Sequence, residues 1–494
     1  MQKEPILIII ILILAISTAL SPWLMNNAPY IGDAWLHLRK AEDIVIQGRL
    51  KLEEYNDMWP LVNLLLVFYS TILGLSPLIS TQMIPFLVSL STINLYIISS
   101  KISRNIYAAF STPIALIFTP LYTFITFGSA VMKETAAFYL TTLLITYFLV
   151  SRPNLICFLL LSFGLVVGHH FASLAVFILL LSILIEDFSD LLNGDTCHLR
   201  RDIVMVSIFG ALLLSWNFFV FSKIGWFLPI SSNSLLMIIF TWFGIYIISR
   251  IGRFSSVAFQ AFLIPLTALA WRGYLHDIPT PVNPISIWEV RDLIIFIIPA
   301  LIGLALFWRN RIIRSILVST TTLIAFSLIS GLDYNGLVVF TKSLHYYSVF
   351  WALMFGLSWP SILNKRFGKM LFTVVSIYLV LASVTGIGLA LNGPGAYNEV
   401  EYEQLQGLRD KLHEPLIMDV KLSYLSKYLN VENSIFHNLK QGEYVLLTKS
   451  NFIYGILLGY VWVDLSLYMP HHLIVSCDRL VDGGYIKILR INNV

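Results

Sequence analysis

Long apolar runs recur along most of the sequence and constrain this chain more than any other feature. A helix needs roughly 20 mostly apolar residues to cross the hydrocarbon core of a bilayer. Only 12% of the 494 residues are charged, whereas a soluble domain carries about 25%. The sequence therefore predicts a mainly α, polytopic transmembrane helical bundle. The expected apolar segments are 5–24, 60–79, 82–100, 106–122, 135–150, 154–168, 171–186, 203–221, 229–249, 255–271, 293–308, 315–331, 345–362 and 370–391.

The first apolar segment, residues 5–24, resembles a signal peptide only superficially. It is longer than the roughly 7–15 apolar residues of a signal core, and no small-x-small cleavage site stands before the polar loop. We therefore expect an uncleaved first span. The net charge of +4 gives no indication of nucleic-acid binding, and we expect no nucleic-acid partner.

Basic loops predict the orientation, because loops rich in Lys and Arg tend to stay in the cytoplasm. Lys101 and Arg104 lie on the cytoplasmic side with the other basic loops only if segments 60–79 and 82–100 together cross the membrane once. One of the two segments would then be short or re-entrant, with its backbone shielded by protein. The result is about 13 crossings of the cell membrane, a cytoplasmic N-terminus and an external C-terminus. The outward loops are then 25–58, 123–134, 168–171, 222–228, 271–292 and 332–344.

The composition changes near Gly393, where charged residues become common. Residues 401–412 read as a helix, and the short apolar runs 444–448 and 473–476 read as strands. Asp482-Gly483-Gly484 before an alternating segment is typical of a hairpin turn. We therefore expect two domains. Residues 1–392 form the transmembrane domain with its first outer loop at 25–58, and residues 393–494 form a small extracytoplasmic α/β domain.

The first outer loop holds the most unusual polar residues. Asp33 and His37 are four apart and would share one face of a helix. A carboxylate at the membrane surface can bind a divalent cation or accept a proton, and a nearby His or Arg can steady a phosphate. Trp35, Leu38, Ala41 and Val45 would form the apolar stripe of a short helix lying in the membrane interface. The alternative to a functional site is a solvated amphipathic helix with ordinary charges.

The order of motifs here resembles the GT-C superfamily of membrane glycosyltransferases. A first span is followed by Gly32-Asp33, His37 and Arg39, then by Trp59-Pro60 and later Gly74-Leu75. Oligosaccharyltransferase catalytic subunits have a similar Asp-x-x-Tyr-His-x-Arg run in this loop. The resemblance implies a polyprenyl-phosphate-linked sugar donor and transfer on the outer face. It also implies that Asp33 is the catalytic base or the ligand of a divalent cation such as Mg or Mn, with His37 and Arg39 supporting the donor phosphate.

The chain departs from oligosaccharyltransferases in two motifs. Their Trp-Trp-Asp-Tyr-Gly motif is missing, since residues 462–465 read Trp-Val-Asp-Leu. The outer loops also contain no Asp-x-Asp sequence. Both absences argue against glycosylation of asparagine and favour a transferase of single sugars.

Further candidates lie in the later outer loops. Several GT-C enzymes carry an acidic residue in a similar second outer loop. Glu134 resembles that residue, and the resemblance implies a catalytic role. The alternative is an interfacial charge pair with Lys133. His169 and His170 contact the donor phosphate or merely form a polar turn. Lys342 with His345 resembles the basic donor-phosphate site, or is a snorkelling lysine in an aromatic belt. The 271–292 loop is a substrate gate or a plain connector.

The leading hypothesis is a GT-C-like glycosyltransferase whose partners are the lipid-linked donor, membrane lipids and a glycan, lipid or protein acceptor. A transporter or flippase of lipid-linked sugars is the first alternative, although transporters usually show paired halves and midplane charges. A polysaccharide polymerase or ligase is the second. We expect such an enzyme to rely on a large Arg-rich outer loop, whereas the 271–292 loop has only Arg272 and Arg291.

Overall fold

The computed structural model describes most of the chain. The described residues are 4–30, 33–118, 128–149, 154–192, 199–225, 232–277, 298–329, 334–392, 397, 399–408, 415–436, 439–448 and parts of 451–492. The 271–292 loop, for which a gating role was one prediction, lies largely outside them.

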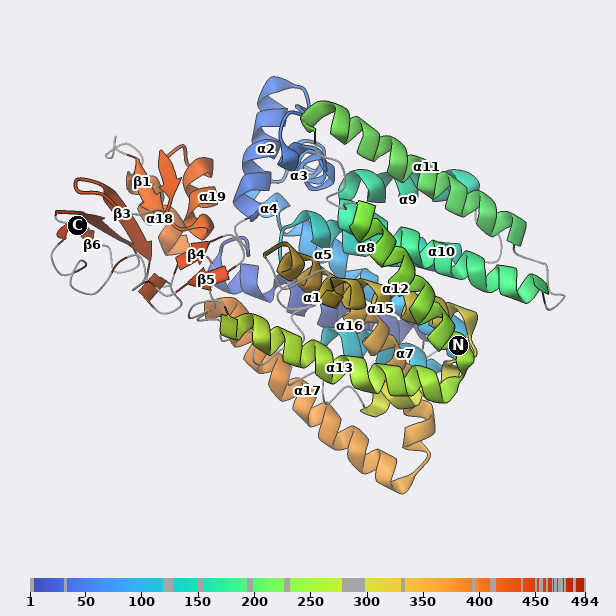
Figure 1. The fold of residues 1–494 in the computed structure, drawn as a ribbon. Helices are drawn as coiled ribbons and strands as arrows, with labels where there is room; N and C mark the ends of the chain where they lie inside the picture. The colour runs from blue at the N-terminus through green and yellow to red at the C-terminus, as the bar shows by residue number, and fades with distance from the viewer. Residues whose placement is uncertain are drawn as a thin grey trace.

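Helices make up most of the described chain, and they gather into one large bundle with a smaller sheet-containing unit beside it (Figure 1). The helices before the sheet are α1 (Glu4–Asn26), α2 (Asp33–Gln47), α3 (Leu61–Thr71), α4 (Pro77–Ser80), α5 (Met83–Ser89), α6 (Ser91–Ser103), α7 (Ile106–Ile117), α8 (Lys133–Phe148), α9 (Leu155–Gly168), α10 (His170–Leu192), α11 (Leu199–Ile224), α12 (Ser232–Ile251), α13 (Arg253–Asp277), α15 (Arg311–Ile329), α16 (Tyr334–Leu363) and α17 (Arg366–Asn392).

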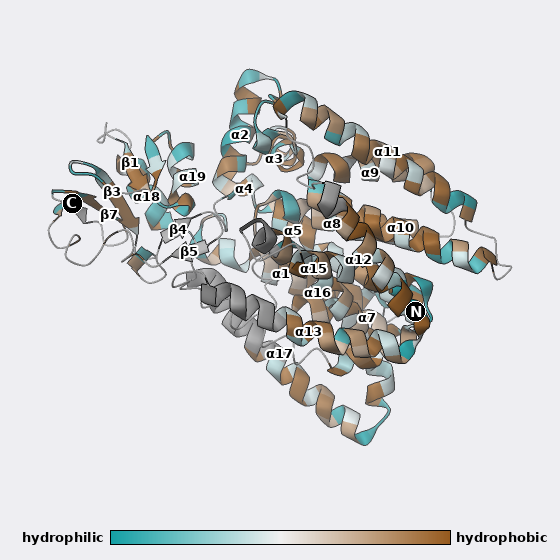
Figure 2. Ribbon diagram, viewed as in Figure 1, coloured by the Kyte–Doolittle hydropathy of each residue, from teal (hydrophilic) through white to brown (hydrophobic). Residues whose placement is uncertain are grey.

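The bundle has the length and surface of a multi-pass membrane protein. Within the described residues, five helical stretches are long and apolar enough to cross a bilayer: α1, the α4–α6 stretch Pro77–Ser103, α10, α11 and α15. Large apolar side chains are exposed on the outer helices, among them Phe218 and Phe240, where lipid would cover them. Figure 2 shows apolar residues along most of the bundle helices. The predicted membrane class is therefore confirmed, whereas the count of about 13 crossings stays a prediction.

The segments expected at 60–79 and 82–100 differ from two equal spans. Helix α3 has 11 residues, which is about 17 Å at 1.5 Å per residue and too short to cross the membrane alone. The chain turns at Gly74, whose φ is +65°, and α4–α6 then run 27 residues as one candidate span. Helix α3 contacts both α2 and α4. The single net crossing by the whole segment stays a prediction.

The C-terminal unit is a small α/β structure. Its helices are α18 (Glu399–Leu408) and α19 (Val420–Tyr428), and its five-stranded sheet has the order β2-β1-β3-β7-β6. Strand β1 is parallel to β2 and β3, whereas β7 is antiparallel to β3 and β6. The strands are β1 (Leu416–Met418), β2 (Asn433–Ile435), β3 (Tyr444–Thr448), β6 (Asp478–Asp482) and β7 (Ile486–Arg490), with a separate hairpin of β4 (Ile456–Leu458) and β5 (Val461–Val463).

The expected strand at 444–448 and the final hairpin are present in this unit. The expected strand at 473–476 lies largely outside the described residues, and the strand next to it begins at Asp478. The predicted domain boundary at 392/393 stays a prediction.

Helix α2 lies between the bundle and the C-terminal unit. Trp35 and Leu38 share a buried cluster with Leu405 and Leu422 of that unit. The other face, with Ala34 and Ala41, packs on α3 and on the start of α8. The expected stripe of Trp35, Leu38, Ala41 and Val45 against lipid is therefore wrong, because protein covers the first three and Val45 is exposed.

Candidate functional site

Glu134 is the centre of a buried ionic cluster. It is the second residue of α8, where the N-terminal end of the helix favours a negative charge. Its Oε1 lies 3.1 Å from Nε2 of His169 and 2.5 Å from Nζ of Lys342. His169 follows α9 and Lys342 lies on α16. Three of the predicted site residues, far apart in the sequence, therefore meet at one point.

Asp33 begins α2 and lies within the electric field of this cluster. Burial and the charge of Glu134 together raise the pKa of Asp33 to about 6, while Lys133 and Lys342 oppose the shift. A short parallel bridge between Tyr30 and Ala130 joins the segments that precede α2 and α8. Asp33 is thus close enough to Glu134 and Lys342 for both charges to affect it, and its predicted catalytic role stays a prediction.

His37 is buried one turn after Asp33. Its Nδ1 lies 2.7 Å from Oδ1 of Asn63 on α3. Burial lowers the pKa of His37 to about 4, so the imidazole is neutral at pH 7. The predicted contact with the donor phosphate stays a prediction, but a neutral imidazole is a weaker phosphate partner than a charged one.

Arg39 points toward the C-terminal unit. It is two residues from His37, and residues at that spacing do not share a helix face. Its Nη1 donates a hydrogen bond of 2.6 Å to the carbonyl oxygen of Lys427. Arg39, a residue of α2, therefore contacts α19 and does not belong to the Glu134 cluster.

A wall of aromatic and basic side chains adjoins the cluster. The His170 ring lies 4.7 Å from both the Trp59 and the His169 rings. Nζ of Lys133 donates to Oδ1 of Asn56 at 3.2 Å and lies 5.6 Å from the centroid of the Tyr55 ring. Tyr55 was not among the predicted site residues. In the sequence, only its position four residues before Trp59 connects it with the site.

His345 is buried on α16, one turn further along than Lys342. Because Lys342 and His345 are three residues apart, they lie on neighbouring positions of one helix surface. The predicted contact of His345 with the donor phosphate stays a prediction.

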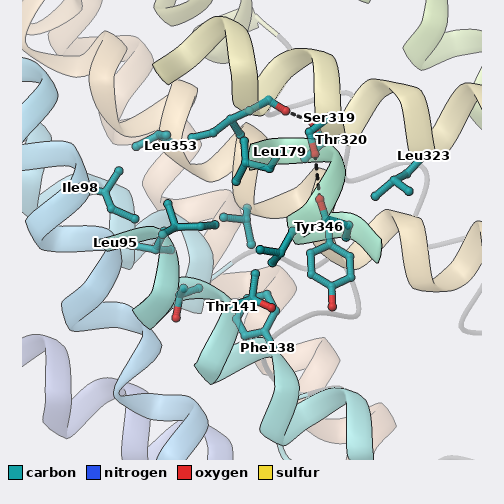
Figure 3. A pocket seen from close by; sticks show the side chains of 16 residues that line it. Leu95, Ile98, Phe138, Thr141, Leu179, Ser319, Thr320, Leu323, Tyr346 and Leu353 are labelled. Carbon is teal, nitrogen blue, oxygen red and sulfur yellow. Dashed lines mark hydrogen bonds between the residues drawn. The ribbon is translucent and has the colours of Figure 1, made fainter. Parts of the chain in front are cut away.

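A small cavity lies inside the bundle near the cluster. Its lining includes Phe138, four residues after Glu134, and Tyr346, four residues after Lys342 (Figure 3). Thr141, Ser319 and Thr320 contribute hydroxyl groups among apolar side chains. Its volume of about 50 Å³ holds a few water molecules at most. A polyprenyl chain therefore does not fit in this cavity.

The described residues contain no group of three or more His, Cys, Asp or Glu that could hold a metal ion. Glu134 is already paired with Lys342 and hydrogen-bonded to His169, which leaves Asp33 as the nearby carboxylate for a cation. Such a cation would need phosphate or water oxygens to complete its shell, as Mg²⁺ commonly does. The divalent cation stays a prediction with Asp33 as its ligand.

A second ionic cluster joins the other ends of several helices. Glu186 lies 3.0 Å from Nε of Arg314 and 3.1 Å from Nη1 of Arg250. Asp187 pairs with Arg311, and Asp202 lies 2.5 Å from Nε of Arg201. These arginines belong to the basic segments 198–201, 250–253 and 309–314, which the preference of Lys and Arg for the cytoplasmic side predicts to be cytoplasmic. Sequence analysis did not single out the three acids, which stand at the ends of apolar runs.

Comparisons with solved structures show the class of fold. The structure of the archaeal oligosaccharyltransferase AglB from Archaeoglobus fulgidus, in complex with an inhibitory peptide and a dolichol-phosphate, matches with a TM-score of 0.52 and 11% identity. The match covers 88% of this chain and 61% of AglB, so the chain spans less than two thirds of that protein's length. ArnT from Cupriavidus metallidurans bound to undecaprenyl phosphate matches with a TM-score of 0.43 and 10% identity, over 98% and 97% of the two chains.

No protein-family model and no curated protein matches the sequence. At these identities, the likeness to AglB establishes the fold alone. The chain therefore has a fold like that of the GT-C glycosyltransferases, and the resemblance predicted from the first outer loop is confirmed at that level.

Proposed function

We propose that the chain is a membrane glycosyltransferase that moves a sugar from a polyprenyl-phosphate donor to an acceptor at the outer face. The observation that carries this proposal is the meeting of Asp33, Glu134, His169 and Lys342 at the start of α2 and α8. AglB, whose fold is similar, was solved with a dolichol-phosphate. A cluster that contains lysines at the membrane edge is suited to bind the phosphate of a polyprenyl-phosphate donor.

The cluster divides the chemistry between an acid and its neighbouring cations. The acceptor hydroxyl oxygen attacks the anomeric carbon, and the bond from that carbon to the phosphate oxygen breaks. Asp33 takes the hydroxyl proton, because a pKa of about 6 is close to the operating pH. The phosphate keeps the bonding electron pair, and Lys342 with Lys133 stabilises its charge. Glu134 orients Lys342. Direct displacement inverts the anomeric carbon, as the GT-C resemblance implies.

The missing motifs favour transfer of a single sugar. The chain lacks the Trp-Trp-Asp-Tyr-Gly sequence of oligosaccharyltransferases. A transporter or flippase fits less well, because transporters place their charged sites near the membrane midplane. Here Asp33 and Glu134 occupy the first two positions of their helices.

The proposal is tested with the full chain in proteoliposomes, supplied with labelled polyprenyl-phosphate sugars and with acceptors added to one side. Asp33→Asn should reduce transfer by about 10²–10⁴-fold, the usual contribution of a positioned general base. Asp43→Asn, ten residues further along α2, is the matched control and should transfer normally.

Undiminished transfer by Asp33→Asn would remove Asp33 from the mechanism. Absence of transfer by the native chain from every donor would refute the enzymatic proposal. Transfer only to acceptors on the cytoplasmic side, the side of Lys101 and Arg104, would refute the predicted sidedness.

A further inference from the structure

Trp35, two residues after Asp33, is enclosed by tyrosines of the C-terminal unit. Its ring stacks on Tyr402 with centroids 5.5 Å apart and an interplanar angle of 12°. Tyr428 lies at 5.4 Å, and Tyr397 meets the ring edge-on at 5.9 Å. Trp35 is only 1% exposed. We name these four residues, Trp35, Tyr397, Tyr402 and Tyr428, the aromatic clamp.

Hydrogen bonds reinforce the clamp along α2. Arg39 donates to the carbonyl oxygen of Lys427, and Tyr428 Oη donates to Oε1 of Glu42 at 3.0 Å. Asn27, which precedes α2, donates to Oε2 of Glu399 at 3.0 Å. Trp35, Arg39 and Glu42 recur at helical spacing, so they face the same side. One face of the helix is therefore attached to the C-terminal unit over two turns.

The opposite face of α2 fits closely to the bundle. Ala34 and Ala41 are buried there against Val62, Leu66 and Ala136. Small side chains let the helix approach α3 and α8, but they provide little interlocking of their own. The angle of α2 therefore depends on the larger side chains of the clamp on its other face.

Asp33 interacts electrostatically with Tyr397 of the clamp. Tyr397 is buried, and the negative charge of Asp33 is one of the charges that raise the pKa of its phenol. The start of α2 is thus close to both Tyr397 and the Glu134 cluster. Loosening the clamp would move this start and admit water to Asp33.

We propose that the C-terminal unit positions Asp33 for catalysis through the aromatic clamp, which makes Trp35, Tyr402 and Tyr428 positioning residues of the transfer reaction. This inference rests on the proposed function. The clamp residues themselves touch neither donor nor acceptor. A displacement of about 1 Å at a reacting group can cost 10²-fold in rate, so a loosened clamp acts on turnover and not on donor binding.

The test changes the clamp from the C-terminal side and leaves α2 intact. Tyr402→Ala with Tyr428→Ala should reduce kcat by about 10- to 100-fold with little change in the donor KM. The acid limb of the pH–rate profile should move to lower pH, because a hydrated Asp33 returns toward its ordinary pKa. Tyr402→Phe with Tyr428→Phe keeps the rings and should restore most of the rate.

Phe452→Ala is the matched control. Phe452 belongs to the same unit, is 47% exposed and has Lys487 5.8 Å from its ring centroid. It should leave both kcat and the pH profile unchanged. If the control shifts the profile as much as the tyrosine changes do, the effect is general destabilisation and the clamp proposal is overturned.

A second measurement does not depend on sugar transfer. In a chain with Cys157, Cys197 and Cys477 replaced by serine, Asp33→Cys is labelled with a membrane-impermeant maleimide. Adding the two tyrosine-to-alanine changes should raise the labelling rate about tenfold. An unchanged rate in folded, monodisperse protein would overturn the clamp, even if the native chain transfers sugar. A raised rate in a chain that transfers no sugar would leave the clamp standing and refute only the proposed function.

Discussion

The two ionic clusters at the ends of α10 use similar charges in different ways. His169 and His170 stand at the start of the helix beside Glu134, and Glu186 lies 16 residues further on, about 24 Å along the axis. That distance is close to the roughly 30 Å hydrocarbon thickness. The two clusters are therefore about one hydrocarbon thickness apart. We call the Glu186 cluster the inner cluster and the Glu134 cluster the outer cluster, after the predicted sidedness.

The inner cluster pairs each of its acids with arginine. Glu186 accepts hydrogen bonds from both Arg314 and Arg250, and Asp187 and Asp202 each have an arginine of their own. The planar guanidinium forms fixed, forked hydrogen bonds and stays charged at all working pH values. Such pairs hold α10, α12 and α15 in one arrangement, whereas Arg201 and Asp202 both belong to α11.

The outer cluster uses lysine and histidine, and the pKa values of both its acids are shifted, that of Glu134 downward and that of Asp33 upward. Glu134 is paired with Lys342 and His169, but Asp33 keeps a pKa raised to about 6. Lysine is a point charge whose position can adapt to a phosphate. Perturbed titration in a charged cluster is typical of functional sites. The two clusters therefore differ in their cations, arginine in the inner one and lysine with histidine in the outer one, and not in complete pairing, since Asp187 and Asp202 each keep a buried carboxylate oxygen without a hydrogen-bond partner among the described residues.

The largest expected effect tests the inner cluster. Glu186→Gln removes the acid shared by Arg314 and Arg250 and leaves buried positive charge unpaired. Breaking such a pair costs about 3–5 kcal/mol in stability. Thermal or denaturant unfolding in detergent should show this loss, while the transfer rate per folded molecule should not change. A large drop in that rate would show that the inner cluster also takes part in function.

Glu134→Gln should have the opposite result. The isosteric change removes the charge that orients Lys342 and His169, and we expect kcat to fall by about 10²–10³-fold, as for loss of one preorganised electrostatic group. Stability should change less than in Glu186→Gln, because lysine can redirect its ammonium toward water. Equal losses of stability in the two variants would remove the distinction between the clusters.

The candidate site could be predicted in its parts but not in its pairing. Asp33, Glu134, His169 and Lys342 each interrupt or border an apolar run, and a charge at such a place is costly to keep. Nothing in their sequence spacing showed that His169 and Lys342 would share Glu134. That contact depends on how α8, α9 and α16 pack, which hydropathy does not encode.

The fold shows the same limit at α2. The 3.6-residue period correctly predicted a helix after the first span, but a period does not say what covers the apolar face. Trp35 meets tyrosines that lie more than 350 positions later in the sequence. The acids of the inner cluster were not predicted for the same reason. Glu186 stands at the end of an apolar run, where charged residues commonly end a helix, and the sequence does not show that Arg250 and Arg314 lie beside it.

The pH dependence separates Asp33 from His37. If the Asp33 carboxylate is the base, the rate should fall about tenfold per unit below pH 6 and level off above it. His37 cannot cause this inflection, because its pKa is lowered to about 4. A pH–rate profile that is flat between pH 5 and 7 would contradict the role of Asp33.

The same titration affects stability with a definite sign. The folded pKa of Asp33 lies above the ordinary value of 3.8, so the folded state holds the proton more tightly than the unfolded state. The stability gained from the neutral carboxyl is fully present below pH 3.8 and is lost as the pH rises through about 6. Asp33→Asn should therefore unfold at a higher temperature than the native chain at pH 7.5, with no difference near pH 3.8.

The smallest expected effect distinguishes two roles for Arg39. If Arg39 binds the donor phosphate, Arg39→Ala should have a much higher donor KM. If Arg39 only donates a hydrogen bond to the Lys427 carbonyl, its loss should cost about 1 kcal/mol. We expect a fall in kcat of roughly two- to tenfold with an unchanged KM. Arg49→Ala, an exposed change just beyond α2, should do nothing. A KM raised more than tenfold by Arg39→Ala would return Arg39 to the phosphate site, and the contact with α19 would then describe only one of two positions of α2.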